Sequence, residues 1–188
     1  INGALSKTGN NTDAYRLLRQ REYPSWLYPV INGATTIWER LNSYTLEDGF
    51  GGNNSMNSFN HYSFGAVGAW MYNYSLGIRR DEASPGFRHF ILEPVPDPDR
   101  VLTFAKGYFD SPYGRIASSW ERVGPAALYR FTVPPNTSAT LRLPAKSLKQ
   151  VTEGGRRLRR APGISQLKEG NGRVQLELAS GTYEFRVE

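Results

Sequence analysis

The sequence contains no cysteine and has two histidines, His61 and His89. Without cysteine the chain has no disulfide, no thiolate metal ligand and no cysteine nucleophile. Two histidines argue against a histidine-rich metal site, and no cluster of carboxylates calls for calcium. No apolar run approaches the ~18 residues of a membrane span, and the start shows no signal-peptide pattern. We therefore expect no metal, no cofactor and no membrane partner.

Positive charge is in excess, with a formal net charge of +6 that lies mostly in the second half of the chain. Its peak is a cluster of four arginines: Arg156, Arg157, Arg159 and Arg160. Such a run could contact phosphates. The flanking Gly154-Gly155 and Pro162-Gly163 are instead typical of a solvated turn or hairpin loop. We therefore expect no nucleic-acid partner.

Helical patterns are confined to the first half of the chain. Residues 1–11 are polar and are predicted to be a loop, and Thr12 or Asp13 can cap a short helix that ends near Arg21. Residues 41–57 form a long loop rich in glycine and asparagine, which indicates a functional or mobile segment. A second helix is predicted from about Asn60 to Ile78.

The predicted helix over 60–78 is apolar on all sides, as is typical of a helix that is buried all round. One other short helix is predicted to cover it, so much of its surface would face water. Large exposed apolar patches mark interfaces. We therefore expect a missing N-terminal part of the same enzyme, or a second chain, to cover this helix. The chain also begins at Ile1 rather than at methionine, which supports the expectation that upstream sequence has been lost.

From Phe87 the hydrophobic period changes from helical to two. Apolar residues alternate with polar ones in five runs, separated by glycine, proline, asparagine or serine: Ile116, Ser118, Trp120; Ala127, Tyr129, Phe131, Val133; Ala139, Leu141, Leu143; Val174, Leu176, Leu178; Tyr183, Phe185, Val187. This pattern predicts an antiparallel β-sandwich. The fold class is therefore a two-part α+β chain, with a helical part over 1–86 and a β-sandwich over 87–188.

Two motifs carry the chemistry. Trp38-Glu39-Arg40 places a carboxylate between an apolar ring and a cation, an environment that can tune its basicity. Asn60-His61-Tyr62 follows about twenty residues later. Glu39 could also be an ion-paired surface residue, and His61 a helix cap or a core histidine. Glu47 and Asp48 are competing carboxylates, which we interpret as solvated loop residues.

Five segments resemble one known family, in the family's own order. Arg21–Trp26, Asn32–Arg40 and Asn57–Tyr72 are similar to the C-terminal part of the catalytic domain of α-L-rhamnosidases, glycoside hydrolase family 78. Phe87–Pro96 and Tyr108–Gly114 resemble the start of that family's C-terminal β-domain. The resemblance covers nearly the whole chain. It implies that residues 1–86 are the last helices and loops of an (α/α)6 barrel and that 87–188 are the C-terminal β-sandwich.

The resemblance also assigns roles. It implies that Glu39 is the general base of an inverting hydrolase of terminal α-L-rhamnosides and that His61 contacts the sugar at the cleavage point. Trp38 and Asn60, in the same two motifs, are expected to bind substrate. Inversion needs a second carboxyl group about 6.5–9.5 Å away. In the family this general acid lies far upstream, so we expect these 188 residues to be inactive alone.

One departure from the family concerns the loop. Leu41-Asn42 stands where a Trp-Asp pair is common, which puts the contribution of the following loop to substrate choice in doubt. The rival hypothesis is a non-catalytic carbohydrate-binding or scaffold module, since many β-sandwiches have such roles. A planar row of exposed aromatic rings would favour it, but Trp120 falls in the core pattern. A third hypothesis keeps the enzyme class and changes the sugar, because other (α/α)6-barrel hydrolases share the architecture.

Overall fold

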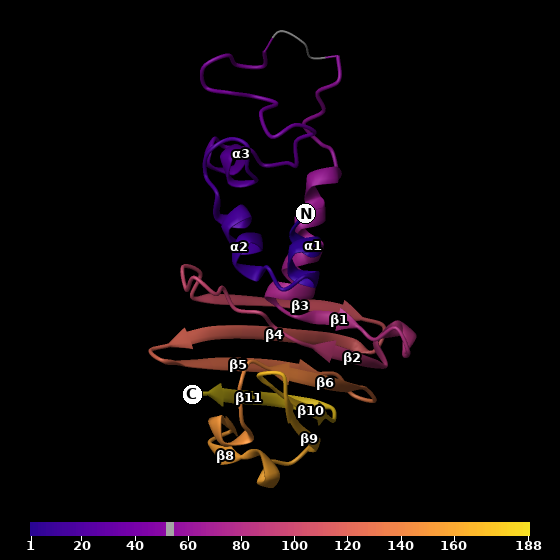
Figure 1. The fold of residues 1–188 in the computed structure, drawn as a ribbon. Coiled ribbons are helices and arrows are strands. Elements are labelled where there is room, and N and C mark those ends of the chain that lie inside the picture. Colours follow the sequence, from indigo (N-terminus) through magenta and orange to yellow (C-terminus); the bar gives the residue numbers. More distant parts are fainter. Residues whose placement is uncertain (52–54) are drawn as a thin grey trace. The chain divides into compact units, whose positions relative to one another are not determined.

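The computed structural model describes residues 1–51 and 55–188 (Figure 1). The chain divides into two compact units, Ile1–Trp70 and Met71–Glu188, which we call the helical unit and the sandwich unit. The predicted loop over 41–57 includes residues 52–54, which lie outside the described residues. The two-part α+β architecture is confirmed.

Short helices build the helical unit: α1 (Asn2–Lys7), α2 (Asn11–Arg19), α3 (Leu27–Ile31), a 3-10 turn (Ser63–Gly65) and α4 (Ala66–Trp70). The helix predicted to end near Arg21 is α2. The Trp70 ring meets the buried Tyr15 ring edge-on at 5.0 Å, and its Nε1 donates to Ser6 Oγ at 2.8 Å. These contacts join α1, α2 and α4 around one aromatic pair.

The prediction of a loop over residues 1–11 is wrong, because α1 occupies most of it. Its residues are polar, so no apolar period marks the helix. A tertiary contact stabilises α1 instead: Asn2 is buried and its Nδ2 donates to the Ala14 carbonyl of α2 at 2.9 Å. Such contacts between helices override weak local preference.

The prediction of a single helix over 60–78 is also wrong. The structure has the 3-10 turn, then α4, then a π-helical turn over Met71–Ser75, and Ile78 already begins strand β1 (Ile78–Arg80). Gly77 ends the helical run, since its φ is +72° and a Cβ there would lie 2.1 Å from the Glu93 carbonyl carbon. No side chain fits so close an approach. Leu76 and Ile78 belong to the sandwich core and not to a helix face.

The sandwich unit consists of two sheets. The five-stranded sheet has the order β1-β2-β6-β10-β9, and the six-stranded sheet has the order β3-β4-β5-β11-β7-β8. All strand pairs are antiparallel except β2 with β6, which pair in parallel from His89↔Ser138 to Leu92↔Leu141. The remaining bounds are β2 (His89–Leu92), β3 (Phe104–Ser111), β4 (Gly114–Val123), β5 (Ala126–Val133), β6 (Ser138–Leu143), β7 (Val151–Glu153), β8 (Arg156–Arg157), β9 (Ile164–Gly170), β10 (Arg173–Leu178) and β11 (Gly181–Val187).

The core lies between the two sheets, and every residue of the five predicted inward-facing runs is buried. Trp120 is 1% exposed and its Nε1 donates to the Ser75 carbonyl at 2.8 Å. Full burial of one large apolar side chain contributes about 1.5–3 kcal/mol. The alternation therefore correctly predicted both the strands and the face that each strand buries.

The boundary near Phe87 stays a prediction. In the structure β1 lies upstream of this residue and pairs with β2, with Ile78 opposite Leu92. A 3-10 turn over Pro85–Phe87 connects the two strands. By strand pairing, the five-stranded sheet thus begins at Ile78.

Candidate active site

The two motifs lie side by side in the helical unit. The Ile37 carbonyl accepts from the His61 N–H at 2.7 Å, and the Glu39 N–H donates to the Ser58 carbonyl at 2.8 Å. Thr36 Oγ1 also donates to the Phe59 carbonyl. Residues 36–40 and 57–61 therefore run antiparallel as two bonded segments. This arrangement brings all four predicted site residues into one small region.

Glu39 is held by its own side chain as well as by its backbone. Its Oε2 accepts from the Ser58 N–H at 2.8 Å, and the side chain is half-buried. Within residues 1–51 and 55–188, Oε1 accepts no hydrogen bond and Glu39 forms no ion pair. A carboxylate fixed through one oxygen, with the other free, can accept a proton from a positioned water.

His61 presents a defined ring nitrogen. Its Nδ1 accepts from the Ser63 N–H at 3.3 Å, so the neutral ring carries its proton on Nε2. The ring stacks on Tyr62, with centroids 5.3 Å apart and planes 18° from parallel. The Nε2–H is therefore a donor that suits a sugar hydroxyl.

Trp38 and Asn60 take different positions in this region. Trp38 is 8% exposed and meets Phe59 edge-on at 5.3 Å. Phe59 in turn meets Phe50 at 5.5 Å. Trp38 thus anchors the first motif segment by packing, whereas Asn60 is exposed and its N–H donates to Ser58 Oγ at 3.2 Å. Their predicted role in binding substrate stays a prediction.

The competing carboxylates lie in a tight turn of the loop. Thr45 and Gly49 exchange backbone hydrogen bonds of 2.9 Å, and the Asp48 N–H donates to Thr45 Oγ1 at 3.0 Å. Glu47 and Asp48 are both exposed. In the part of the chain that the structure describes, neither carboxylate takes part in an ion pair.

Two residues that were not predicted as site residues also belong to this region. Ser58 supplies the N–H that holds Glu39. Tyr62 is 86% exposed beside the ring of His61. The aromatic residue directly after the histidine was a usable signal for Tyr62, because exposed aromatic rings with a polar group suit sugars. For Ser58 the sequence contains no signal of this role, since the residue acts through its backbone.

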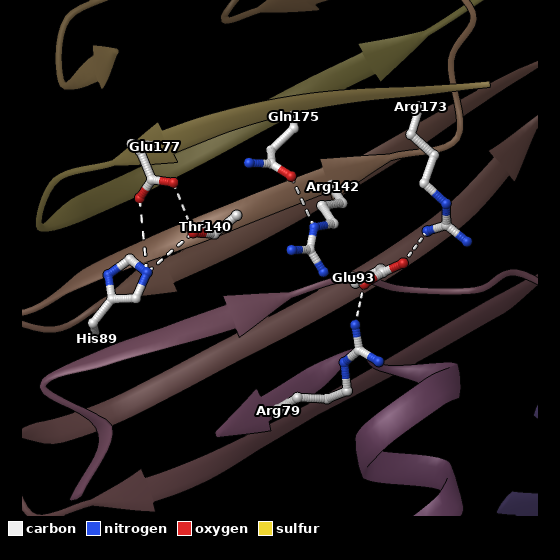
Figure 2. Close-up of polar contacts among 8 residues, drawn as sticks. All are labelled: Arg79, His89, Glu93, Thr140, Arg142, Arg173, Gln175 and Glu177. Atoms are coloured by element: carbon white, nitrogen blue, oxygen red, sulfur yellow. Dashed lines mark hydrogen bonds and ion pairs between the residues drawn. The ribbon is translucent and has the colours of Figure 1, made fainter. Parts of the chain in front are cut away.

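A second polar cluster lies on the outer face of the five-stranded sheet (Figure 2). Glu93, directly after β2, is 13% exposed and pairs with Arg79 of β1, Arg142 of β6 and Arg173 of β10. Arg142 also donates to Gln175 Oε1 at 3.0 Å. One carboxylate thus joins three strands through charge-assisted hydrogen bonds, which are about twice as strong as neutral ones.

His89 belongs to a neighbouring row on the same face (Figure 2). Its Nδ1 lies 2.7 Å from Ser138 Oγ and its Nε2 lies 3.0 Å from Thr140 Oγ1, which donates to Glu177 Oε1 at 2.7 Å. Asp81 Oδ2 is 3.9 Å from Nε2. Both ring nitrogens are thereby occupied by hydroxyl groups, so this histidine has a structural role in the sheet.

The described residues hold no group of three histidine, cysteine or acidic side chains arranged to bind a metal ion. Among the helices of residues 1–51 and 55–188, none is long and apolar enough to cross a bilayer.

The chain is similar to known families over most of its length. Residues 1–75 match the bacterial alpha-L-rhamnosidase 6 hairpin glycosidase domain, and residues 77–158 match the bacterial alpha-L-rhamnosidase C-terminal domain. An alpha-L-rhamnosidase of Formosa agariphila is 36% identical over 187 residues, covering 100% of this chain and 20% of that protein. One from Streptomyces avermitilis is 37% identical over 185 residues, covering 97% of this chain and 16% of that protein.

Solved structures show the same relationship. The crystal structure of Streptomyces avermitilis alpha-L-rhamnosidase complexed with L-rhamnose aligns with a TM-score of 0.84 at 34% identity, covering 99% of this chain and 17% of that one. The alpha-L-rhamnosidase from Dictyoglumus thermophilum aligns with a TM-score of 0.81 at 32% identity, covering 99% and 20%. The chain thus spans 16–20% of the length of these relatives.

A helical unit that matches a six-hairpin glycosidase domain, followed by a β-sandwich that matches a rhamnosidase C-terminal domain, places the chain in the six-hairpin glycosidase class. The chain belongs to the α-L-rhamnosidase family, glycoside hydrolase family 78.

Proposed function

We propose that this chain supplies the C-terminal part of an inverting α-L-rhamnosidase and that Glu39 is its general base. The observation that carries the proposal is the fixed carboxylate: Glu39 Oε2 accepts from the Ser58 N–H, and the segment that contains Ser58 also positions His61. Both motifs lie within the range that matches a rhamnosidase glycosidase domain. The substrate is then a terminal α-L-rhamnoside.

In this mechanism Glu39 takes a proton from water through Oε1, while Oε2 stays bonded to Ser58. The water attacks the anomeric carbon from the face opposite the leaving group, which inverts the configuration. His61 donates from Nε2 to a hydroxyl of the bound sugar and orients the ring. Tyr62, stacked on His61, offers an exposed aromatic face to the sugar or its leaving group.

The leaving oxygen needs a proton from a second carboxyl group, about 6.5–9.5 Å from the first. Glu47 and Asp48 lie in a solvated turn, so we assign the general acid to a part of the enzyme beyond these 188 residues. Loss of such an acid costs about 10²- to 10⁴-fold in rate. The 188-residue chain alone should therefore release little or no L-rhamnose from an aryl α-L-rhamnoside.

The test uses the longest form of the enzyme that contains this chain, with the 188-residue chain beside it. Glu39→Gln in the longer form should lower kcat by about 10²- to 10⁴-fold with little change in KM, because the amide cannot accept the proton. Glu47→Gln is the matched control and should leave the rate unchanged. Proton NMR should show β-L-rhamnose as the first product. A Glu39→Gln rate within about tenfold of wild type, or α-L-rhamnose formed first, would contradict the assignment.

The rival function, a carbohydrate-binding sandwich, finds less support. Trp120 is buried and cannot stack on a sugar. On β3 the exposed Phe104 and Tyr108 occupy outward positions, but the Arg115 guanidinium lies 3.7 Å from the centre of the Tyr108 ring. That ring face is therefore occupied by a cation–π contact.

A further inference from the structure

The sandwich unit concentrates the positive charge of the chain in one segment. Residues 146–160 hold six cations and one carboxylate, a net charge of +5 against +6 for the whole chain. The segment comprises a 3-10 turn (Leu148–Gln150), β7, β8 and a second 3-10 turn (Leu158–Arg160). Neither proposed catalysis nor the core uses these cations.

The backbone under these cations is well fixed. Ser147 caps the first turn in a capping box with Gln150, and Glu169 Oε1 accepts from the Leu148 N–H at 2.5 Å. Gly154 and Gly155, with φ of +51° and +74°, turn the chain from β7 into β8. Leu158 is buried and holds the second turn against the core. The backbone that carries the arginines is therefore held in place by hydrogen bonds and by packing.

Four of the cations surround a hollow of about 550 Å³. We call them the basic patch: Lys149, Arg157, Arg159 and Arg160. Val151 and Leu158 contribute its apolar floor, and no carboxylate lines it. Within the described ranges 1–51 and 55–188, none of the four forms an ion pair.

Several other arginines of the sandwich unit form ion pairs. Arg115 binds Asp110, Arg130 binds Glu184, and Arg186 binds Glu188. The one carboxylate of the segment, Glu153, does not line the hollow; its charge instead acts on Tyr183, where burial and Glu153 together raise the pKa of the phenol. The basic patch therefore has no internal counter-charge.

Unpaired arginines around a hollow suit an anion, and their planar forks match the two oxygens of a carboxylate or a phosphate. A bilayer surface is disfavoured, because none of the apolar side chains that line the hollow is exposed and so none is available there to insert into lipid. Single-stranded nucleic acid is disfavoured because no aromatic ring lines the hollow, whereas its bases bind by stacking on such rings. We propose that the basic patch binds an acidic polysaccharide through its carboxylate groups.

The test measures binding of the 188-residue chain to polygalacturonate by affinity electrophoresis and calorimetry at low ionic strength, where exposed charges are least screened. The triple variant R157Q/R159Q/R160Q should bind about tenfold more weakly, as expected for the loss of three exposed charge contacts. The matched control R88Q/R100Q/K106Q removes the same charge from three exposed positions elsewhere in the sandwich unit. It should bind within about twofold of wild type. Circular dichroism verifies that both variants are folded.

Three further measurements test whether binding requires the arginine side chains and the carboxylates of the polymer. Arginine-to-lysine changes at the same three positions keep the charge but lose the fork, and should weaken binding to an intermediate degree. Fully methyl-esterified polygalacturonate should not bind, since it lacks the carboxylates. Equal losses in the two triple variants, equal binding of the esterified polymer, or tighter binding of duplex DNA or phosphatidylserine vesicles would each overturn the proposal. None of these outcomes depends on Glu39 or on rhamnoside cleavage.

Discussion

The helical unit and the sandwich unit are stabilised in different ways. Among the described residues, five buried apolar side chains lie in the helical unit: Ala14, Tyr15, Pro29, Trp38 and Trp70. The sandwich unit holds a continuous core between its two sheets. The helical unit also exposes large apolar side chains such as Val30, Ile31 and Met56. The candidate active site therefore lies in the unit with the smaller core of its own.

The small core of the helical unit limits what can hold the candidate site in place. Glu39 and His61 are positioned by backbone hydrogen bonds between two irregular segments, with Trp38 and Phe59 as their packing support. Loops that carry function need a rigid scaffold. We infer that the scaffold for this site is supplied by the rest of the barrel, which is consistent with the small share of its relatives that the chain covers.

Separating the two units tests whether each has a core that is sufficient for folding. We expect residues 71–188 to unfold in one cooperative urea transition, because they contain a complete core, and residues 1–70 to show none. Circular dichroism of the two peptides measures this directly. Phe131→Ala should lower the free energy of unfolding of 71–188 by about 3–5 kcal/mol, since this buried ring contacts Tyr129 and Phe185. A cooperative transition in 1–70 alone would contradict the contrast.

The sequence predicted the sandwich better than the helical unit, and the reason is physical. In a strand, burial alternates with each residue, so Ile116, Trp120 and Leu176 reveal their direction locally. Where the helical pattern ends, by contrast, the structure is decided by a contact between residues that are distant in the sequence. Leu76 and Ile78 continue an apolar helical pattern in the sequence. The close approach of Gly77 to the Glu93 backbone ends the helix, so that both side chains pack in the sandwich core.

The candidate site was predictable through resemblance rather than from local pattern. The motif residues Glu39 and His61 were recognised by their family context, and the structure places their segments side by side. Ser58 was not predictable, since any residue can donate its N–H. The cluster at Glu93 was missed because its arginines come from three separate strands.

A smaller effect is expected when the ion-pair cluster around Glu93 in the sandwich unit is disrupted. Glu93→Gln removes the negative charge that faces Arg79, Arg142 and Arg173, and leaves three guanidinium groups with one neutral amide. Lost charged hydrogen bonds of this kind cost about 1.5–3 kcal/mol. Urea unfolding of residues 71–188 should therefore show a loss of that order, reduced at high salt.

The matched control is Glu121→Gln, which makes the same chemical change at an exposed position 3.6 Å from Arg130. Arg130 keeps its shorter bond to Glu184, so we expect a change of about 0.5 kcal/mol or less. If Glu93→Gln were as mild as this control, the cluster in Figure 2 would contribute no more than a surface ion pair.

The smallest expected effect depends on pH and again concerns the sandwich unit. The Tyr183 hydroxyl donates to the Ala179 carbonyl at 2.9 Å, and burial together with the nearby Glu153 raises the pKa of this phenol above its usual value. A raised pKa in the folded state means that folding favours the neutral ring. Its stabilisation is therefore complete below the pKa of the unfolded chain, about 10, and is lost as the pH rises through the folded value.

Tyr183→Phe removes both the hydrogen bond and the ionisation. At pH 8 the variant should be less stable by about 1 kcal/mol, the usual value of one hydrogen bond. The gap between wild type and variant should close as the pH rises beyond about 10, because the wild-type phenol then becomes charged beside Glu153 and two backbone carbonyls. Urea unfolding at a series of pH values measures the gap, with Tyr113→Phe removing the same hydroxyl from an exposed ring as the control. A gap that widened with pH would mean that the phenolate is stabilised in the fold, and would reverse the assigned effect of burial at this site.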